Sequence, residues 1–322
     1  MNIQSIINQI ALLFIIMAVG FAVGKTKMLT KEGNRVLSKF ILFITLPCTI
    51  LNSVFETEIK ITAGDTMFFL LMALLAFAIA FMISLPVIRL LGADKATGGL
   101  LNFMTIFSNC GFMGYPVIIA IFGLSSAYYI ALFNIPFNVL VFSVGIYMIS
   151  EKKTKDPLDS PDDPYERKSP GRMILKQTLN PTLIVALAAI PIALTGLRFP
   201  VLINEAIGYI SNITTPGAMI VLGASLAHVP FKSIFGDRRI APVALLKLLV
   251  IPIVTWFILK QIITNELMLG VLVIISGMPT AAMSSMLAIE YGGNEKIASA
   301  GVFITTLLCG ITVPLIVYLL LI

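Results

Sequence analysis

The sequence predicts an all-α, polytopic membrane protein whose ten transmembrane helices form two inverted five-helix repeats. Of its 322 residues, 58% are hydrophobic and 12% are charged, whereas a soluble domain carries roughly 25% charged residues. The mean hydropathy is +1.00. Because one span needs about 20 apolar residues, a chain of this length holds about ten helices and no separate soluble domain.

Apolar runs bounded by charged residues mark the ten spans, as hydropathy does for membrane helices in general. The runs lie at residues 5–24, 36–55, 66–91, 99–122, 126–149, 179–197, 203–227, 240–260, 266–289 and 297–322.

One long polar stretch, residues 151–177, separates two sets of five spans. Its charges and prolines predict a loop without secondary structure. We therefore expect a first repeat at 1–150, a loop at 151–177 and a second repeat at 178–322. Because five is an odd number, the two halves enter the membrane from opposite sides, and the repeat is inverted.

The distribution of Lys and Arg predicts the orientation. On one side of the membrane the connections hold only Lys60, Arg198 and Lys260, and all other basic residues fall on the opposite side. Cytoplasmic connections carry the excess of basic residues. The sequence therefore predicts a cytoplasmic central loop and both termini outside the cell.

Landmark residues recur at a nearly constant offset of about 168–169 positions, as expected for a repeat. They are Pro47 and Pro216, Ser108 and Ser276, and Gly123 and Gly292.

Spans four and nine contain segments that can interrupt a helix. Span four has SNCGFMGYP at 108–116, and span nine has SGMPTAAMSS at 276–285. Proline removes a backbone donor and glycine weakens a helix, and the freed backbone groups persist only inside protein or beside a cavity. Two such breaks would cross near the midplane and direct half-helix N-termini, which are partly positive, at one site. That arrangement suits a carboxylate or another anion.

The alternative interpretation is that these residues only kink or pack helices. Under the binding-site interpretation, the candidate substrate-binding residues in the two segments are Ser108, Asn109, Cys110, Gly111, Ser276, Pro279 and Thr280. The candidate helix-break residues are Pro47, Gly114, Pro116, Pro216 and Gly277.

Span five places Asn134 and Asn138 on one helix face, on either side of Pro136. An amide that faces lipid is costly, so this face is expected to point inward. The two amides either line the substrate site or bond a neighbouring helix.

Lys247, in span eight, is the deepest ionisable residue of the spans. It either neutralises a substrate carboxylate or extends its long side chain to the interface. No span holds an Asp or Glu at mid-depth, so the usual carboxylate relay of a proton-driven carrier is missing, and the coupling ion, proton or sodium, stays open.

Other function classes find little support. The basic residues follow the loops of the topology instead of one face of a domain, so no nucleic acid partner is expected. The chain has no phosphate-binding loop, no nucleophile elbow, no HExxH motif and no Cys/His metal spacing. We therefore expect no enzyme activity, no cofactor and no metal site.

Four segments carry a family resemblance that extends over essentially the whole chain. They are SNCGFMGYPVIIAIFG in span four, NPTLIVALAAIPIALTGLRFP at the start of the second half, LKLLVIP in span eight and SGMPTAA in span nine. With the ten-span plan, they resemble the auxin efflux carrier family, whose bacterial members include malate and malonate permeases and whose plant members export auxin.

The resemblance implies a fold shared with bile-acid/sodium symporters, in which helices four and nine are broken and cross. It also implies a scaffold of helices 1, 2, 6 and 7, often dimeric, against which helices 3–5 and 8–10 move as an elevator. Asn109 matches an Asn that helps plant members hold the substrate carboxylate, and Pro279 matches the second crossover proline. Ser108 departs from the family, because plant members have Pro there. The short loop fits a protein of the bacterial inner (plasma) membrane.

The function expected from the sequence is secondary active transport of a small organic anion, such as malate or an auxin-like acid. A sodium-coupled symporter of the bile-acid type is the first alternative. A membrane sensor that binds an organic acid without moving it is the second, and a membrane enzyme is the third.

Overall fold

The computed structural model describes residues 3–55, 62–150, 181–197, 199–229 and 236–321. The loop expected at 151–177 and two basic residues of the sparse side, Lys60 and Arg198, lie outside the described residues. Within the described ranges the protein is all-helical, with one isolated β-bridge and no strand. The all-α prediction is confirmed for this part of the chain.

The helices of the first half follow the predicted spans closely. In chain order they are α1 (Ile3–Lys25), α2 (Lys31–Phe40), η1 (Ile41–Thr45), α3 (Leu46–Phe55), α4 (Ala63–Leu90), α5 (Lys95–Ile106), η2 (Cys110–Gly114), α6 (Tyr115–Phe122), α7 (Ser126–Leu140), η3 (Val141–Gly145) and α8 (Ile146–Ile149), where η marks a π-helical segment.

The second half continues in the same way. Its elements are α10 (Pro181–Thr195), α11 (Val201–Ser211), α12 (Thr214–Ala227), α14 (Ile240–Leu245), η4 (Leu246–Val250), α15 (Ile251–Leu259), α16 (Glu266–Ser276), α17 (Ser284–Tyr291), α18 (Glu295–Ile316) and η5 (Val317–Leu321).

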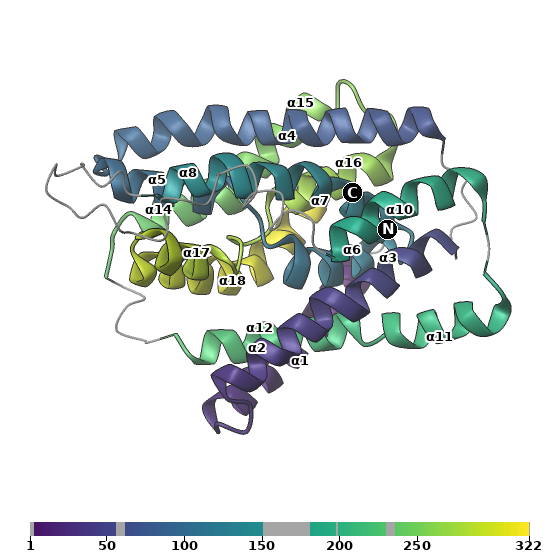
Figure 1. The fold of residues 1–322 in the computed structure, drawn as a ribbon. Helices are drawn as coiled ribbons and strands as arrows, with labels where there is room; N and C mark the ends of the chain where they lie inside the picture. The colour runs from purple at the N-terminus through teal and green to yellow at the C-terminus, as the bar shows by residue number, and fades with distance from the viewer. Residues whose placement is uncertain (1–2, 56–61, 151–180, 198, 230–235, 322) are drawn as a thin grey trace, which may run out of the picture.

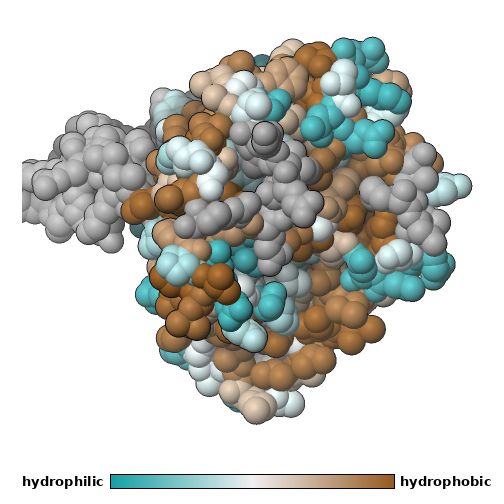
Figure 2. Space-filling model, turned by 90° about the vertical axis from the view of Figure 1, so that its right-hand side faces the viewer, coloured by the Kyte–Doolittle hydropathy of each residue, from teal (hydrophilic) through white to brown (hydrophobic). Residues whose placement is uncertain are grey.

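Seven helices of the described residues are long and apolar enough to cross a membrane. Three shorter apolar helices, at 110–122, 181–195 and 266–276, lie in the regions predicted as spans four, six and nine. Large apolar side chains reach the surface on many helices, and Figure 2 shows hydrophobic residues at the surface beside hydrophilic ones. The chain is a multi-pass membrane protein.

Three π-helical segments lie directly before a helix with proline in its first turn. The residue before Pro116 bonds five residues back, from the Tyr115 N–H to the Cys110 carbonyl, and η4 ends in the same way before Pro252. A proline cannot donate to the carbonyl four residues earlier and its ring clashes with it, so the preceding turn widens.

Three of the helix-break predictions, Pro47, Gly114 and Pro116, need correction. Pro47 follows η1 inside an uninterrupted helical stretch from residue 31 to residue 55. Gly114 and Pro116 lie in η2 and in the first turn of α6, past the interruption of span four. Widening of the preceding turn lets the helices around Pro47 and Pro116 accommodate proline without ending. Pro216, in contrast, lies just after a two-residue interruption between α11 and α12.

Close packing of glycines joins α1 to α12. A Cβ added at Gly20 would collide with the Ile220 carbonyl group, and one added at Gly223 of α12 would collide with the backbone of Met17. Small residues let membrane helices approach to backbone contact. In Figure 1, α1 crosses α12 obliquely, and α4 lies on the opposite side of the molecule from α11 and α12.

Hydroxyl groups join α3 to the α11–α12 segment. Thr49 and Thr214 share a hydrogen bond of 2.7 Å between their side-chain oxygens, and the Ser211 hydroxyl donates to Thr49 at 3.3 Å. All three side chains are buried. The hydroxyls near Pro47 and Pro216 therefore serve helix packing, and α3 also packs against α10.

Candidate functional site

Spans four and nine are each interrupted by an extended segment. The first half-helix, α5, ends at Ile106, and Phe107 follows with φ −92° and ψ 118°. The other half-helix, α16, ends at Ser276, with Gly277 as its C-cap residue. Helical structure resumes at Cys110 in span four and at Ser284 in span nine.

The two extended segments cross and pair with each other. Ser108 and Thr280 form an antiparallel bridge. The Asn109 N–H donates to the Pro279 carbonyl at 2.8 Å, and the Ala281 N–H donates to the Phe107 carbonyl at 2.9 Å. An interrupted helix leaves backbone groups without partners, which is costly inside a membrane. Each interruption therefore supplies the partners that the other lacks.

Thr280 also links the crossing segments to α5 and α18 through hydrogen bonds. Its hydroxyl donates to the Met104 carbonyl in α5 at 2.9 Å, and its N–H donates to the Thr305 hydroxyl in α18 at 3.1 Å. Thr305 in turn donates to the Gly301 carbonyl at 2.7 Å. Both threonines are completely buried. Thr305 was not among the residues predicted from sequence, because a hydroxyl in a membrane helix usually bonds its own backbone.

Lys247 lies at the crossover, in η4. Its ammonium donates to the Ser108 hydroxyl at 2.7 Å and to the Ile106 carbonyl at 3.4 Å, and the side chain is 0% exposed. The alternative in which Lys247 extends to the interface is therefore wrong. The reason lies in the neighbouring half-helix: α5 ends at Ile106, and its last carbonyl group, at the negative end of the half-helix, attracts a cation.

Asn109 caps the helical segment that follows the first interruption. Its side-chain oxygen accepts from the Phe112 N–H at 3.2 Å. Its amide nitrogen is buried without a hydrogen-bond partner, although a buried donor normally has one. A buried donor without an acceptor favours an anionic or carbonyl-bearing ligand.

The Asn134 and Asn138 amides bond their own helix. Asn134 donates to the Ile130 carbonyl at 3.0 Å, and Asn138 donates to the Asn134 carbonyl at 2.7 Å. Both side chains are 8% exposed, so this face of α7 points inward, as expected for amides in a membrane.

The remaining candidates surround the crossover. The Ser276 hydroxyl donates to the Val273 carbonyl at 2.7 Å, and the Cys110 thiol lies 3.4 Å from the Ser108 carbonyl oxygen. A Cβ added at Gly111 would lie 3.2 Å from Leu42 in η1, and one added at Gly277 would lie 3.0 Å from Pro252. These glycines allow close approach of neighbouring helices.

A small cavity adjoins the crossover. Its volume is about 10 Å³, and one water molecule needs about 10–15 Å³ in this measure, so an organic acid does not fit without movement of the walls. Ser108 and Ser276 supply its polar lining. The apolar lining comes from Ala76, Phe77, Ala80, Ile106, Phe133 and Ile251. The α4 residues among them were missed from sequence, although Ala76 and Ala80 form a small-residue face at a spacing of four.

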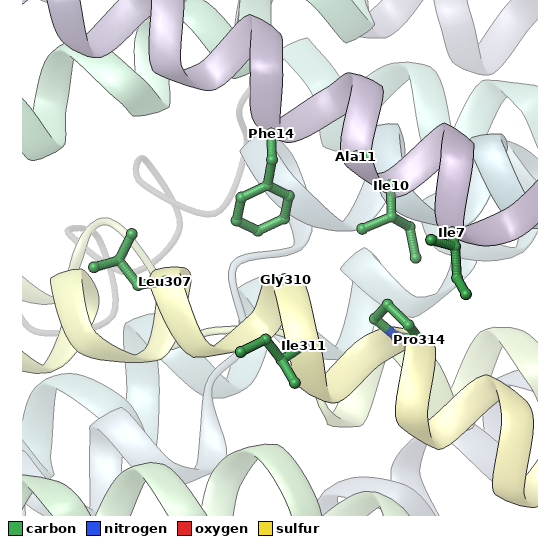
Figure 3. Close-up of a pocket in the computed structure, with 8 residues that line it drawn as sticks. All are labelled: Ile7, Ile10, Ala11, Phe14, Leu307, Gly310, Ile311 and Pro314. Carbon is green, nitrogen blue, oxygen red and sulfur yellow. The ribbon is translucent and has the colours of Figure 1, made fainter.

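A larger groove, of about 320 Å³, lies between α1 and α18 near the chain termini. Figure 3 shows apolar side chains from both helices around it, with Phe14 directed toward α18. None of its lining side chains carries a charge or a hydrogen-bonding group. The groove therefore lacks the polar groups that a binding site for an organic anion requires.

The family model described as "Membrane transport protein" matches residues 5–317. This chain belongs to that family, the auxin efflux carrier family. It is 25% identical over 314 residues to an uncharacterized transporter of Methanocaldococcus jannaschii, covering 93% of this chain and 94% of that protein. An uncharacterized transporter of Methanothermobacter thermautotrophicus is 22% identical over 302 residues, covering 94% of each chain.

A third relative has a name that includes a substrate. It is a "Putative malonate transporter" of Rhizobium meliloti, 24% identical over 293 residues, with 88% of this chain and 86% of that protein covered. The resemblance inferred from the sequence is confirmed by the family match. The family and the relatives' names indicate a membrane transporter and not an enzyme.

Proposed function

We propose that this member of the family is a secondary active transporter of a small organic anion, such as malonate or malate, that works by elevator-type alternating access. The observation that carries the proposal is the paired crossover of two interrupted helices, with the buried and unused amide donor of Asn109 beside it. Interrupted helices that meet inside a membrane protein are a recurrent substrate site of secondary transporters.

The chemistry of the crossover supports an anion. The Asn109 amide nitrogen is buried without an acceptor, and the Lys247 amino group lies 2.7 Å from the Ser108 hydroxyl at the crossover. The N-terminus of the helical segment that Asn109 caps adds partial positive charge. The malonate transporter named among the relatives supports a dicarboxylate in particular.

Helix contacts support a division into scaffold and moving core. We assign α1–α3 and α10–α12 to the scaffold, because α1 packs on α12 and α3 packs on α10 and α11. The core comprises α4–α8 and α14–α18, which are the remaining members of the ten proposed spans. The crossover lies in the core and contacts the scaffold through η2, which packs on α12. Sliding of the core along this contact provides access from each side in turn.

The surroundings of the protein follow from the same proposal. The scaffold helix α11 exposes the apolar side chains of Val201, Leu202 and Tyr209, which suits a homodimer formed through the scaffold within the bilayer. The distribution of Lys and Arg supports an orientation in the bacterial inner (plasma) membrane with both termini outside the cell and the central connection in the cytoplasm.

Counterflow in proteoliposomes tests the proposed function. Vesicles loaded with unlabelled malonate are expected to accumulate labelled malonate transiently, and empty vesicles are not. Binding of malonate without counterflow would favour a membrane sensor over a transporter. A series of mono- and dicarboxylates that neither bind nor exchange would contradict the proposal.

Two substitutions at Asn109 separate binding from helix capping. Asn109→Asp keeps an oxygen that accepts from the Phe112 N–H but replaces the unused donor by a negative charge, whereas Asn109→Ala removes both groups. We expect malonate to raise the melting temperature of the wild type and of neither variant, and only Asn109→Ala to lose the capping contribution of about 0.5–2 kcal/mol. Equal stabilisation of all three proteins by malonate would remove Asn109 from the site.

A further inference from the structure

Lys247 is a buried cation without an acidic neighbour. Both ion pairs found among the described residues involve Arg239, and no Asp or Glu carboxylate contacts the Lys247 ammonium there. An ammonium can donate three hydrogen bonds, and Lys247 makes two, to Ile106 and to Ser108. A charge buried in a membrane protein is costly unless it is paired or has a functional role.

The partners of Lys247 are the kind of oxygens that bind a coupling cation. Ile106 is the last residue of the half-helix α5, and Ser108 lies in the unwound segment that follows. In transporters with interrupted helices, unwound carbonyls and the C-terminal ends of half-helices coordinate the sodium ion or proton. Here the lysine side chain already supplies a positive charge at that place.

We infer that Lys247 is a resident cation of the crossover, which takes the place of a bound sodium ion and makes binding of the organic anion independent of sodium. The predicted effect on anion binding rests on the proposed function, whereas the position of the Lys247 ammonium at the crossover does not. Ser108 holds the ammonium through its hydroxyl, a contact that proline at this position would not provide.

The surroundings of Lys247 indicate that it acts through the crossover. The segment η4 packs against α5, α15 and α18 of the core, whereas η2, which follows Asn109, packs against α12 of the scaffold. Lys247 is therefore a positioning residue: it compensates the negative end of α5 and keeps the crossing segments in a form that accepts an anion. Removal of the Lys247 ammonium should weaken malonate binding, and an added cation should restore it.

The test uses the full-length protein with malonate as the probe, in sodium chloride and in choline chloride. The wild type is expected to bind malonate equally in both salts. Lys247→Ala is expected to bind malonate about 5–150-fold more weakly in choline, the usual range of coupling between two sites, and to recover in methylammonium or sodium chloride. Lys260→Ala is the matched control, because Lys260 ends the same span, is exposed and lies over Trp256. It should behave as the wild type does.

A readout without substrate separates this inference from the proposed function. In the absence of malonate, methylammonium should raise the melting temperature of Lys247→Ala and leave that of the wild type and Lys260→Ala unchanged. Absence of carboxylate binding in every protein and salt would contradict the proposed function alone. A sodium requirement of the wild type, or Lys247→Ala binding malonate normally in choline, would overturn the resident cation. A sodium requirement of the wild type would overturn the inference even if Lys247→Ala does not fold.

Discussion

At the scale of single residues, Thr280 makes the most connections within the crossover. Its backbone pairs with span four, its hydroxyl bonds the Met104 carbonyl, and its N–H bonds Thr305 of α18. Because the site excludes water, the bonds lost on substitution cannot be replaced by solvent. Stability of the whole core should therefore depend on this side chain.

Thr280→Val is expected to lower stability, because the shape is retained while the Met104 carbonyl loses a buried donor. The cost should be about 1–3 kcal/mol, seen as a lower melting temperature in detergent. Thr280→Ser, which keeps the hydroxyl, should stay close to the wild type. Thr195→Val removes an exposed hydroxyl that bonds only its own helix and provides the control. An equal effect of the Thr280 and Thr195 substitutions would contradict the assigned role.

A second residue-scale prediction concerns Asp237, in the connection before α14. Arg239 donates to its carboxylate from Nη2 at 2.6 Å and from Nε at 2.9 Å. These bonds from the Arg239 side chain hold the pKa of Asp237 below its ordinary value. A lowered folded-state pKa means that the pair stabilises the protein above the unfolded-state pKa and loses this effect as the pH falls through the folded-state pKa.

Asp237→Asn should therefore be less stable than the wild type at neutral pH, and the difference should shrink below about pH 4, near the ordinary pKa of Asp. Melting temperatures measured from about pH 3 to about pH 8 check this, because that range spans the ordinary pKa of Asp. Glu290→Gln, which alters an exposed acid, is the control. A difference that is independent of pH would show that the ion pair is not its source.

At the scale of elements, the contact of α1 with α12 depends on the absence of side chains. Gly20 and Gly24 face α12, and Gly223 faces α1 so closely that a Cβ would overlap the Met17 backbone. Gly20 and Gly24 form a GxxxG pattern in span one, and here this pattern coincides with a close helix contact. The partner helix could not be identified from sequence, because the pattern occurs often and does not specify what it packs against.

Gly223→Ala is expected to destabilise the protein by about 1–3 kcal/mol, the usual cost of overpacking, because a backbone atom must move to admit the methyl group. Gly64→Ala is the matched control: Gly64 is also helical, but an added Cβ there would meet only Thr62, at 3.6 Å. Thermal unfolding in detergent compares the two. If Gly223→Ala is as stable as Gly64→Ala, the tight contact is not required.

At the scale of the whole molecule, hydropathy placed the helices well, because each apolar run in the sequence corresponds to helical structure within the described residues. The crossing of spans four and nine was anticipated from their Gly and Pro residues. Which residues form the break in span four was not, because Gly114 and Pro116 lie in helix while Phe107 and Asn109 do not. Gly and Pro indicate that a helix is easily interrupted, whereas backbone pairing with a distant segment determines where the interruption lies.

The environment of Lys247 shows a second limit of sequence reasoning. In the sequence, Lys247 lies about two turns into span eight. This position fits both a side chain that reaches the interface and one buried inside the protein. Only the position of α5 relative to η4 decides between them, and that contact joins residues 139 positions apart in the chain, Lys247 and Ser108. Non-local geometry of this kind leaves no local pattern.

The two hydrogen bonds that join the crossing segments are made by the main chain, from the N–H groups of Asn109 and Ala281 to the carbonyls of Pro279 and Phe107. Proline at 279 takes nothing from this link, and proline in place of Ser108 would likewise leave both donors in place. Related proteins can therefore exchange the side chains at positions 108 and 279 without losing the main-chain link between the crossing segments.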